Sequence, residues 1–209
     1  MYAGGAVYWK GVNGAITRCN FTGNTANYGE GACGGAIHWK GDNGTVTHCN
    51  FIANSASYGA AIYWWKVNDC TVTYCNFKSN AARYKGGAIF WYLGVKGTVT
   101  NCNFTANTAR NGGAIYTKSS VKCVDSIFSG NSAYVDGGAI YAEGNVDVKN
   151  SIFENNKAEG SKSYQCSGGA IRSEKDVKID NCSFLNNHAS NYGGAIYADT
   201  ITWVNIVLL

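Results

Sequence analysis

Residues 34–54 read GGAIHWKGDNGTVTHCNFIAN, and the same words return as GGAIFW at residues 86–91 and GTVTNCNFTAN at residues 97–107. Words of the GGA type begin eight times, at a mean spacing of 27 residues: Gly4, Gly34, Gly59, Gly86, Gly112, Gly137, Gly168 and Gly193. A period of this length is typical of stacked repeat arrays, and the Leu/Asn consensus of leucine-rich repeats is not found. The recurring stretch therefore decides the fold class.

A second word, F-x-x-N-x-A, follows each of the first seven GGA-type words. Its asparagines are Asn24, Asn54, Asn80, Asn107, Asn131, Asn156 and Asn187. Asparagine tolerates a left-handed backbone, and its amide can bond a turn, so we expect these residues at a corner. Stacked in register, the amides would form a ladder, with the phenylalanines as an inward column.

The apolar residues alternate within short runs that are bounded by glycine and enriched in β-branched and aromatic side chains. This pattern favours strands over helices. We expect three short strands per repeat, near A-I-Y, T-V-T and C-N-F, and hence an all-β parallel β-helix of about eight coils of about 27 residues. Residues 1–209 would form a single β-helix segment. Because the chain begins and ends inside a repeat, we expect it to be a fragment of a longer array.

Large and small residues exchange along the chain. The early repeats carry Trp9, Trp39, Trp64 and Trp91, opposite Gly14, Gly44, Cys70 and Gly97. The later repeats carry Thr117, Ala142 and Ser173, opposite Val121, Val146 and Val177. Such an exchange indicates side chains that share one packed interior. The alternative is that the tryptophans point outward.

The pairing of GGA[I/V] with F-x-x-N in tandem resembles the repeats of chlamydial polymorphic membrane proteins. It resembles still more the adhesin-like surface proteins of methanogenic archaea, which are rich in G-G-A-I-Y and N-C-x-F words. The resemblance covers nearly the whole chain. It implies a right-handed parallel β-helix, a location outside the cell or on its surface, and a role in adhesion. We expect no secretion signal within this stretch, so this location rests on the resemblance.

Composition narrows the classes of partner. Only 14% of residues are charged and the formal net charge of +4 is scattered, which argues against nucleic-acid binding. No run of about 18 apolar residues occurs, so we expect no direct membrane insertion. The 45% apolar content excludes disorder.

The nine cysteines follow the repeat. Five lie two positions before the phenylalanine, namely Cys19, Cys49, Cys75, Cys102 and Cys182, and Ser126 and Ser151 hold this position in between. No C-x-x-C pair suggests zinc. In-register side chains point the same way, which disfavours disulfides. We therefore expect free, buried thiols that act as small hydrophobes, and no metal, cofactor or catalytic residue.

Exposed aromatic residues and two long corner loops offer the best binding surface. We predict that one column faces outward: Tyr8, His38, Tyr63, Phe90, Tyr116, Tyr141, Arg172 and Tyr197. The loops NYGEGAC and EGSKSYQCS add Tyr28, Glu30, Tyr164 and Gln165. The favoured function is a surface adhesin or structural stalk that binds a glycan or a host or neighbour-cell surface protein. Uncapped terminal coils suggest end-to-end self-association.

Two alternatives remain open. Parallel β-helices include polysaccharide lyases and hydrolases, which need clustered carboxylates. Here the acids are scattered, and Asp147 is expected to stack between Lys122 and Lys178 as a solvated ladder. The T-x-T words at residues 45–47, 71–73 and 98–100 resemble the arrays of ice-binding β-solenoids, although threonine is also a common outward strand residue.

Overall fold

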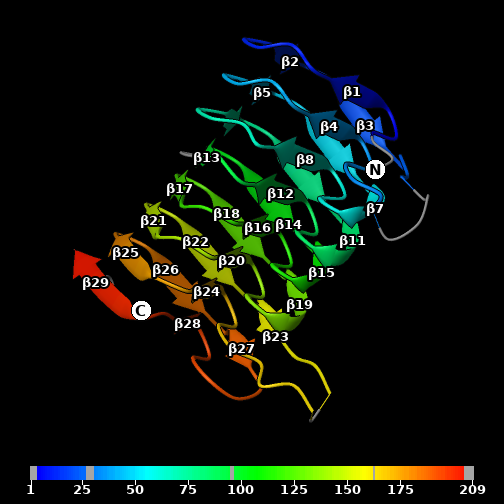
Figure 1. Cartoon of the computed structure of the whole chain (residues 1–209). Helices are drawn as coiled ribbons and strands as arrows, with labels where there is room; N and C mark the ends of the chain where they lie inside the picture. Colours follow the sequence, from blue (N-terminus) through cyan, green and yellow to red (C-terminus); the bar gives the residue numbers. More distant parts are fainter. Residues whose placement is uncertain (1–3, 27–30, 95–96, 162, 205–209) are drawn as a thin grey trace.

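The chain coils into a parallel β-helix in the computed structural model, which describes residues 4–26, 31–94, 97–161 and 163–204. All regular elements within these ranges are strands, stacked coil upon coil from the blue to the red end of Figure 1. Every strand pair is parallel, and the strands form four sheets. Register shifts occur in the fourth sheet, between β7 and β11, between β11 and β15 and between β15 and β19. The eight strands of the first sheet correspond to about seven complete turns, slightly fewer than the eight expected coils.

The first sheet follows the GGA words, and the second contains the T-V-T words. The first consists of β1 (Val7–Trp9), β4 (Ile37–Trp39), β8 (Ile62–Trp65), β12 (Ile89–Tyr92), β16 (Ile115–Thr117), β20 (Ile140–Ala142), β24 (Ile171–Ser173) and β28 (Ile196–Tyr197). The second consists of β2 (Ala15–Thr17), β5 (Thr45–Thr47), β9 (Thr71–Thr73), β13 (Gly97–Thr100), β17 (Val121–Val124), β21 (Val146–Lys149), β25 (Asp176–Asp180) and β29 (Thr200–Val204).

The third sheet holds the phenylalanines, and the fourth follows the asparagine corner. The third consists of β3 (Asn20–Thr22), β6 (Asn50–Ile52), β10 (Asn76–Lys78), β14 (Asn103–Thr105), β18 (Ile127–Ser129), β22 (Ile152–Glu154) and β26 (Ser183–Leu185). The fourth consists of β7 (Ser55–Tyr58), β11 (Ala81–Lys85), β15 (Thr108–Asn111), β19 (Ser132–Asp136), β23 (Lys157–Ala158) and β27 (His188–Ala189). The expectation of three strands per coil is therefore wrong. The fourth strand points only small residues inward, such as Ala82, Ala109 and Ala133, so it left no strong apolar pattern.

The bore is filled by columns of identical or similar side chains. The phenylalanine rings from Phe21 to Phe184 stack with centroids 4.6–5.0 Å apart and planes within 6° of parallel. Isoleucines of the first sheet and valines of the second face them from the other walls. These columns confirm the predicted inward residues Ile37, Val46, Cys49 and Phe51.

The tryptophans lie in the core, as the exchange of large and small residues predicted. Trp39 and Trp64 are fully buried, and a Cβ on Gly44 would lie 2.7–2.9 Å from atoms of their indole rings. Where the column changes to Thr117, the opposite residue Val121 fills the space that the indole leaves, and both are buried. The alternative that these tryptophans face solvent is wrong.

The asparagine ladder forms as predicted. Each side-chain amide donates to the next asparagine Oδ1 at 2.9–3.0 Å. The same amide donates to a phenylalanine carbonyl of the preceding coil, as Asn80 does to Phe51 at 3.0 Å. The left-handed backbone, however, lies one residue earlier, for example at Ala53 and Ser79. The asparagine is required for its amide rather than for its φ angle.

The cysteine column forms a second ladder that the sequence did not reveal. The backbone N–H of Cys49 donates to Cys75 Sγ at 3.4 Å, and that of Cys102 donates to Ser126 Oγ at 3.1 Å. Each side chain in turn donates to the carbonyl two residues earlier. Serine can replace cysteine in this column because both side chains can accept and donate a hydrogen bond at the same place. The expectation of plain hydrophobes is thus wrong in this respect, although all nine cysteines are free, as expected.

Candidate functional site

The aromatic column of the first sheet points away from the bore but is largely covered. Strand register stacks its members coil upon coil. Only its ends, Tyr8 at 43% and Tyr197 at 39%, are exposed. Tyr141 and Arg172 are half-buried. The other four members are at most 3% exposed, so the prediction of an exposed column is wrong for His38, Tyr63, Phe90 and Tyr116.

A second layer of side chains explains the burial of Tyr63, Phe90 and Tyr116. Tyr58 from the fourth sheet, together with Trp65, Tyr92 and Cys33, packs onto the column and forms a hydrophobic cluster separate from the bore. Trp65 and Tyr92 are paired residues at the ends of β8 and β12, and their rings stack 4.5 Å apart at 11°. The accessible aromatic surface therefore belongs to this outer layer, which remains half-buried.

The outer layer borders a groove of about 260 Å³. We call it the aromatic groove and define it by its lining residues: Gly31, Cys33, Tyr58, Tyr63, Trp65, Lys85, Phe90, Tyr92 and Lys118. The first long corner loop supplies Gly31 and Cys33, so this insertion does border the site. Tyr28 and Glu30 lie outside the described residues.

One wall of the aromatic groove carries a linked set of polar groups. Lys85 Nζ donates to the Tyr116 hydroxyl at 2.7 Å, and that hydroxyl donates to Glu143 Oε1 at 2.6 Å. Lys118 Nζ lies 3.7 Å from the same carboxylate and 5.4 Å from the Tyr92 ring centroid. Burial lowers the pKa of Lys85, while Glu143 opposes that effect. Burial and the bond to Glu143 raise the pKa of Tyr116, which stays a neutral donor.

The remaining titratable groups near the aromatic groove do not resemble a nucleophile and its base. Burial raises the pKa of the Cys33 thiol to about 11, so it is protonated at neutral pH. Burial lowers the pKa of His38 to about 4. The two ring nitrogens of His38 have no hydrogen-bond partner within the described residues. Instead, the ring lies edge-on between Tyr8 and Tyr63, with centroids 5.1 and 4.9 Å away.

The second corner loop lies elsewhere along the rod. It leaves the stack of coils after β23, in yellow in Figure 1. Tyr164 is half-buried, accepting a hydrogen bond from Arg110 at 3.2 Å and contacting the Tyr134 ring at 5.5 Å. Gln165 is exposed. Both loops end at the same corner, since Cys33 pairs with Tyr58 and Ser167 with Tyr192 in isolated bridges. The structure thus does not bring Tyr164 and Gln165 to the aromatic groove.

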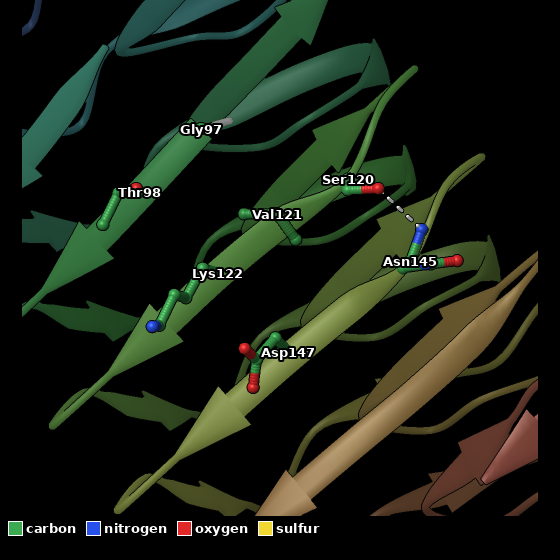
Figure 2. Close-up of a pocket in the computed structure, with 7 residues that line it drawn as sticks. All are labelled: Gly97, Thr98, Ser120, Val121, Lys122, Asn145 and Asp147. Atoms are coloured by element: carbon green, nitrogen blue, oxygen red, sulfur yellow. Dashed lines mark hydrogen bonds between the residues drawn. The ribbon is translucent and has the colours of Figure 1, made fainter. Parts of the chain in front are cut away.

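A second hollow, of about 300 Å³, lies on the threonine face of the second sheet. Figure 2 shows its lining on three neighbouring strands, with Thr98, Lys122 and Asp147 in one column. The threonine pairs are in register over β5, β9 and β13, as predicted. The predicted charge ladder is confirmed too, because Asp147 pairs with Lys122 and Lys178. In the described part of the chain, no group of three or more His, Cys, Asp or Glu side chains could hold a metal ion.

The comparison with known families agrees with this geometry. The model described as the right handed beta helix region matches residues 5–168. The chain belongs to the right-handed β-helix family. The β-helix also matches the repeat of the Chlamydia polymorphic membrane proteins over residues 181–199, as the GGA and F-x-x-N words indicated. Neither the curated proteins nor the solved structures that were compared contain a significant match to this β-helix.

The β-helix family includes some enzymes, so the fold alone does not decide the chemistry. No helix among the described residues is long and apolar enough to cross a membrane. The residues that sequence reasoning missed are Trp65, Tyr92, Lys85 and Lys118. A signal for the first two was present, because the doubled aromatics at residues 64–65 and 91–92 need two environments, one in the bore and one outside.

Proposed function

We propose that this β-helix is a segment of an adhesin-like surface protein that binds a glycan in the aromatic groove. The repeat match to the Chlamydia polymorphic membrane proteins supports the surface role. The observation that carries the binding role is the stacked pair of Trp65 and Tyr92, half-buried at the rim of a groove. Flat aromatic faces of this kind give a large contact area at low cost in side-chain entropy.

The groove is suited to holding a ligand rather than to transforming it. At about 260 Å³ it is slightly smaller than the pockets of about 300–1,000 Å³ that enclose small molecules, so it would accommodate a short part of a longer chain. Among the described residues, the carboxylate that contacts its polar wall, Glu143, is engaged by Tyr116 and Lys118. We infer a non-enzymatic role on this basis, with adhesion as its purpose.

A glycan array probed with the intact chain tests this function. We expect selective binding that falls at least ten-fold for Trp65→Ala or Tyr92→Ala. The matched control is Tyr74→Ala, because Tyr74 is 54% exposed but lies outside the groove. Equal losses with the control, or no bound glycan, would contradict the proposal. Release of new reducing ends from a bound polysaccharide would instead indicate an enzyme.

Ice binding is a second candidate, favoured by one observation. Thr45, Thr71 and Thr98 pair in consecutive coils, and so do the threonines two residues later, which makes a regular array on the second sheet. Thermal hysteresis measured on the wild type and on Thr73→Tyr tests this idea. Activity that Thr73→Tyr abolishes would support ice binding, and no hysteresis in the wild type would end it.

A further inference from the structure

We propose that the glycan held by the aromatic groove is anionic, and that it runs from Lys118 toward the first coils of the rod. This inference rests on the proposed function and names the class of its ligand. The shared chemistry is a sugar that carries a carboxylate or sulfate group. It follows from one further column of the first sheet.

In each coil of the first sheet, one residue directly follows the inward residue that is tryptophan in the early coils and threonine, alanine or serine in the later ones. These following residues form the column, which we call the graded column. Its members, in coil order, are Lys10, Lys40, Trp65, Tyr92, Lys118, Glu143, Glu174 and Asp199. Backbone bonds join neighbouring coils along it, for instance from Lys40 N to Trp9 O and from Glu143 N to Thr117 O. The charge along this edge thus passes from basic, through aromatic, to acidic.

Lysines surround the aromatic part of the graded column. Lys40 of the preceding coil and Lys66, which directly follows Trp65, each place Nζ 5.7 Å from the Trp65 ring centroid. Lys118 lies over Tyr92 on the other side, and Lys85 lies within the groove. Among the described residues, the carboxylate in ion-pair contact with these lysines is that of Glu143, so the described charges around the rings sum to 4 − 1 = +3. A stacked sugar would therefore meet positive charge on both sides.

The acidic end gives the site a direction. Glu174 accepts a hydrogen bond from the Tyr141 hydroxyl at 2.6 Å and forms an ion pair with Arg172 at 3.0 Å. Its side chain is nevertheless 40% exposed. Like charges repel, so a polyanion is disfavoured beyond Glu143 and favoured toward Lys10. From Lys10 to Lys118 the graded column advances four coils, roughly 19 Å at the spacing of adjacent strands.

Three dextrans with one backbone and different charge test the inference: neutral dextran, carboxymethyl dextran and dextran sulfate. Binding to the intact chain is followed by tryptophan fluorescence at low and high salt. We expect at least ten-fold tighter binding of a charged dextran than of neutral dextran. Salt should weaken this binding because the lysines are at least partly exposed to solvent and are therefore screened. Whether the carboxymethyl or the sulfate form binds more tightly identifies the anionic group.

Two pairs of variants locate the charge. The double variant Lys40→Gln/Lys118→Gln should bind the charged dextran about five-fold more weakly and with a smaller salt dependence. The matched control Lys149→Gln/Lys178→Gln removes the same charge from the second sheet and should bind as the wild type does. Glu174→Gln should strengthen binding.

Each other outcome overturns the inference. If all three dextrans bound equally, or none bound, the assignment of an anionic glycan to the groove would be wrong. Equal weakening by both double variants would indicate attraction to the net charge of the chain rather than to the groove. The glycan array with Trp65→Ala remains a separate test, so a neutral glycan bound in the groove would refute the charge assignment and leave the proposed function standing.

Discussion

Replacing His38 by phenylalanine should make the fold more resistant to acid. His38 is fully buried against Tyr8 and Tyr63, and burial, assisted by the nearby charge of Lys40, lowers its pKa to about 4. In the unfolded chain the ordinary value is 6.5. Between these two values the unfolded state binds a proton that the folded state does not, so stability is lost as the pH falls from about 6.5 to about 4.

The size of this loss follows from the two pKa values. At pH 4.5 the linkage relation gives a penalty on the order of 2.5 kcal/mol relative to pH 7.5. Phe90 occupies the same column, so phenylalanine fits the site chemically. His38→Phe also removes two buried nitrogens that have no partner within the described residues, which should add about 1–3 kcal/mol to the free energy of unfolding at neutral pH.

Equilibrium denaturant unfolding at pH 7.5 and pH 4.5, followed by tryptophan fluorescence, measures both effects. Trp39 lies in the coil of His38 and stacks against Trp64 of the next coil, so their fluorescence reports on the region that changes. The wild type should lose about 2.5 kcal/mol more than His38→Phe between the two pH values. The exposed His188→Gln serves as control and should keep the wild-type difference. An identical pH difference in His38→Phe and the wild type would refute the reasoning.

Three further predictions concern the interior, and denaturant unfolding tests each of them. Asn107→Ala should destabilise the fold by about 2–4 kcal/mol, since it breaks a buried ladder and leaves its neighbours unpaired; a loss below about 1 kcal/mol would contradict the ladder's importance. Gly44→Val should lower the free energy of unfolding by at least about 1–3 kcal/mol, because its side chain overpacks the interior. Adding Trp39→Thr to the same chain should recover part of this loss. If the losses of the two single variants simply added in the double variant, the two residues would not share one interior. Cys102→Ser should leave the free energy of unfolding nearly unchanged. Cys102→Val should lower it by about 1–3 kcal/mol, because the Cys75 N–H loses its acceptor. Equal effects of the two variants would count against the second ladder.

The sequence was sufficient for the fold because identical residues stack on themselves. Phe51 meets Phe77 and Asn54 meets Asn80, so the spacing of the words sets the register directly. The exchange of tryptophan for threonine was readable for the same reason, since a packed column must conserve volume.

The sequence was insufficient where a residue's role depends on more than its own column. Tyr63 reads as outward from strand alternation, and it does leave the bore, but Trp65 and Tyr58 pack against it from outside the bore. The fourth strand was missed because it buries only small residues, chiefly alanines. The second ladder was hidden because cysteine looks like a small hydrophobe until its backbone donor is seen.

The charge pattern of the graded column could not be predicted from the overall composition. A net charge of +4 scattered along the chain gave no reason to expect a basic site. Coiling gathers residues about 27 positions apart, so Lys40 and Lys118 come to flank one stacked pair of rings. Which residues come together depends on the register of the strands in neighbouring coils. The basic site is therefore recognised only once that register is known.

Oxidative footprinting of the tryptophans tests the central claim most directly. Trp65 is half-buried at the aromatic groove, whereas Trp203 is 45% exposed in β29 and serves as an internal control. With a saturating charged dextran bound, the oxidation rate of Trp65 should fall several-fold while that of Trp203 stays unchanged. An unchanged rate at Trp65, with the glycan bound, would show that the aromatic groove is not the binding site.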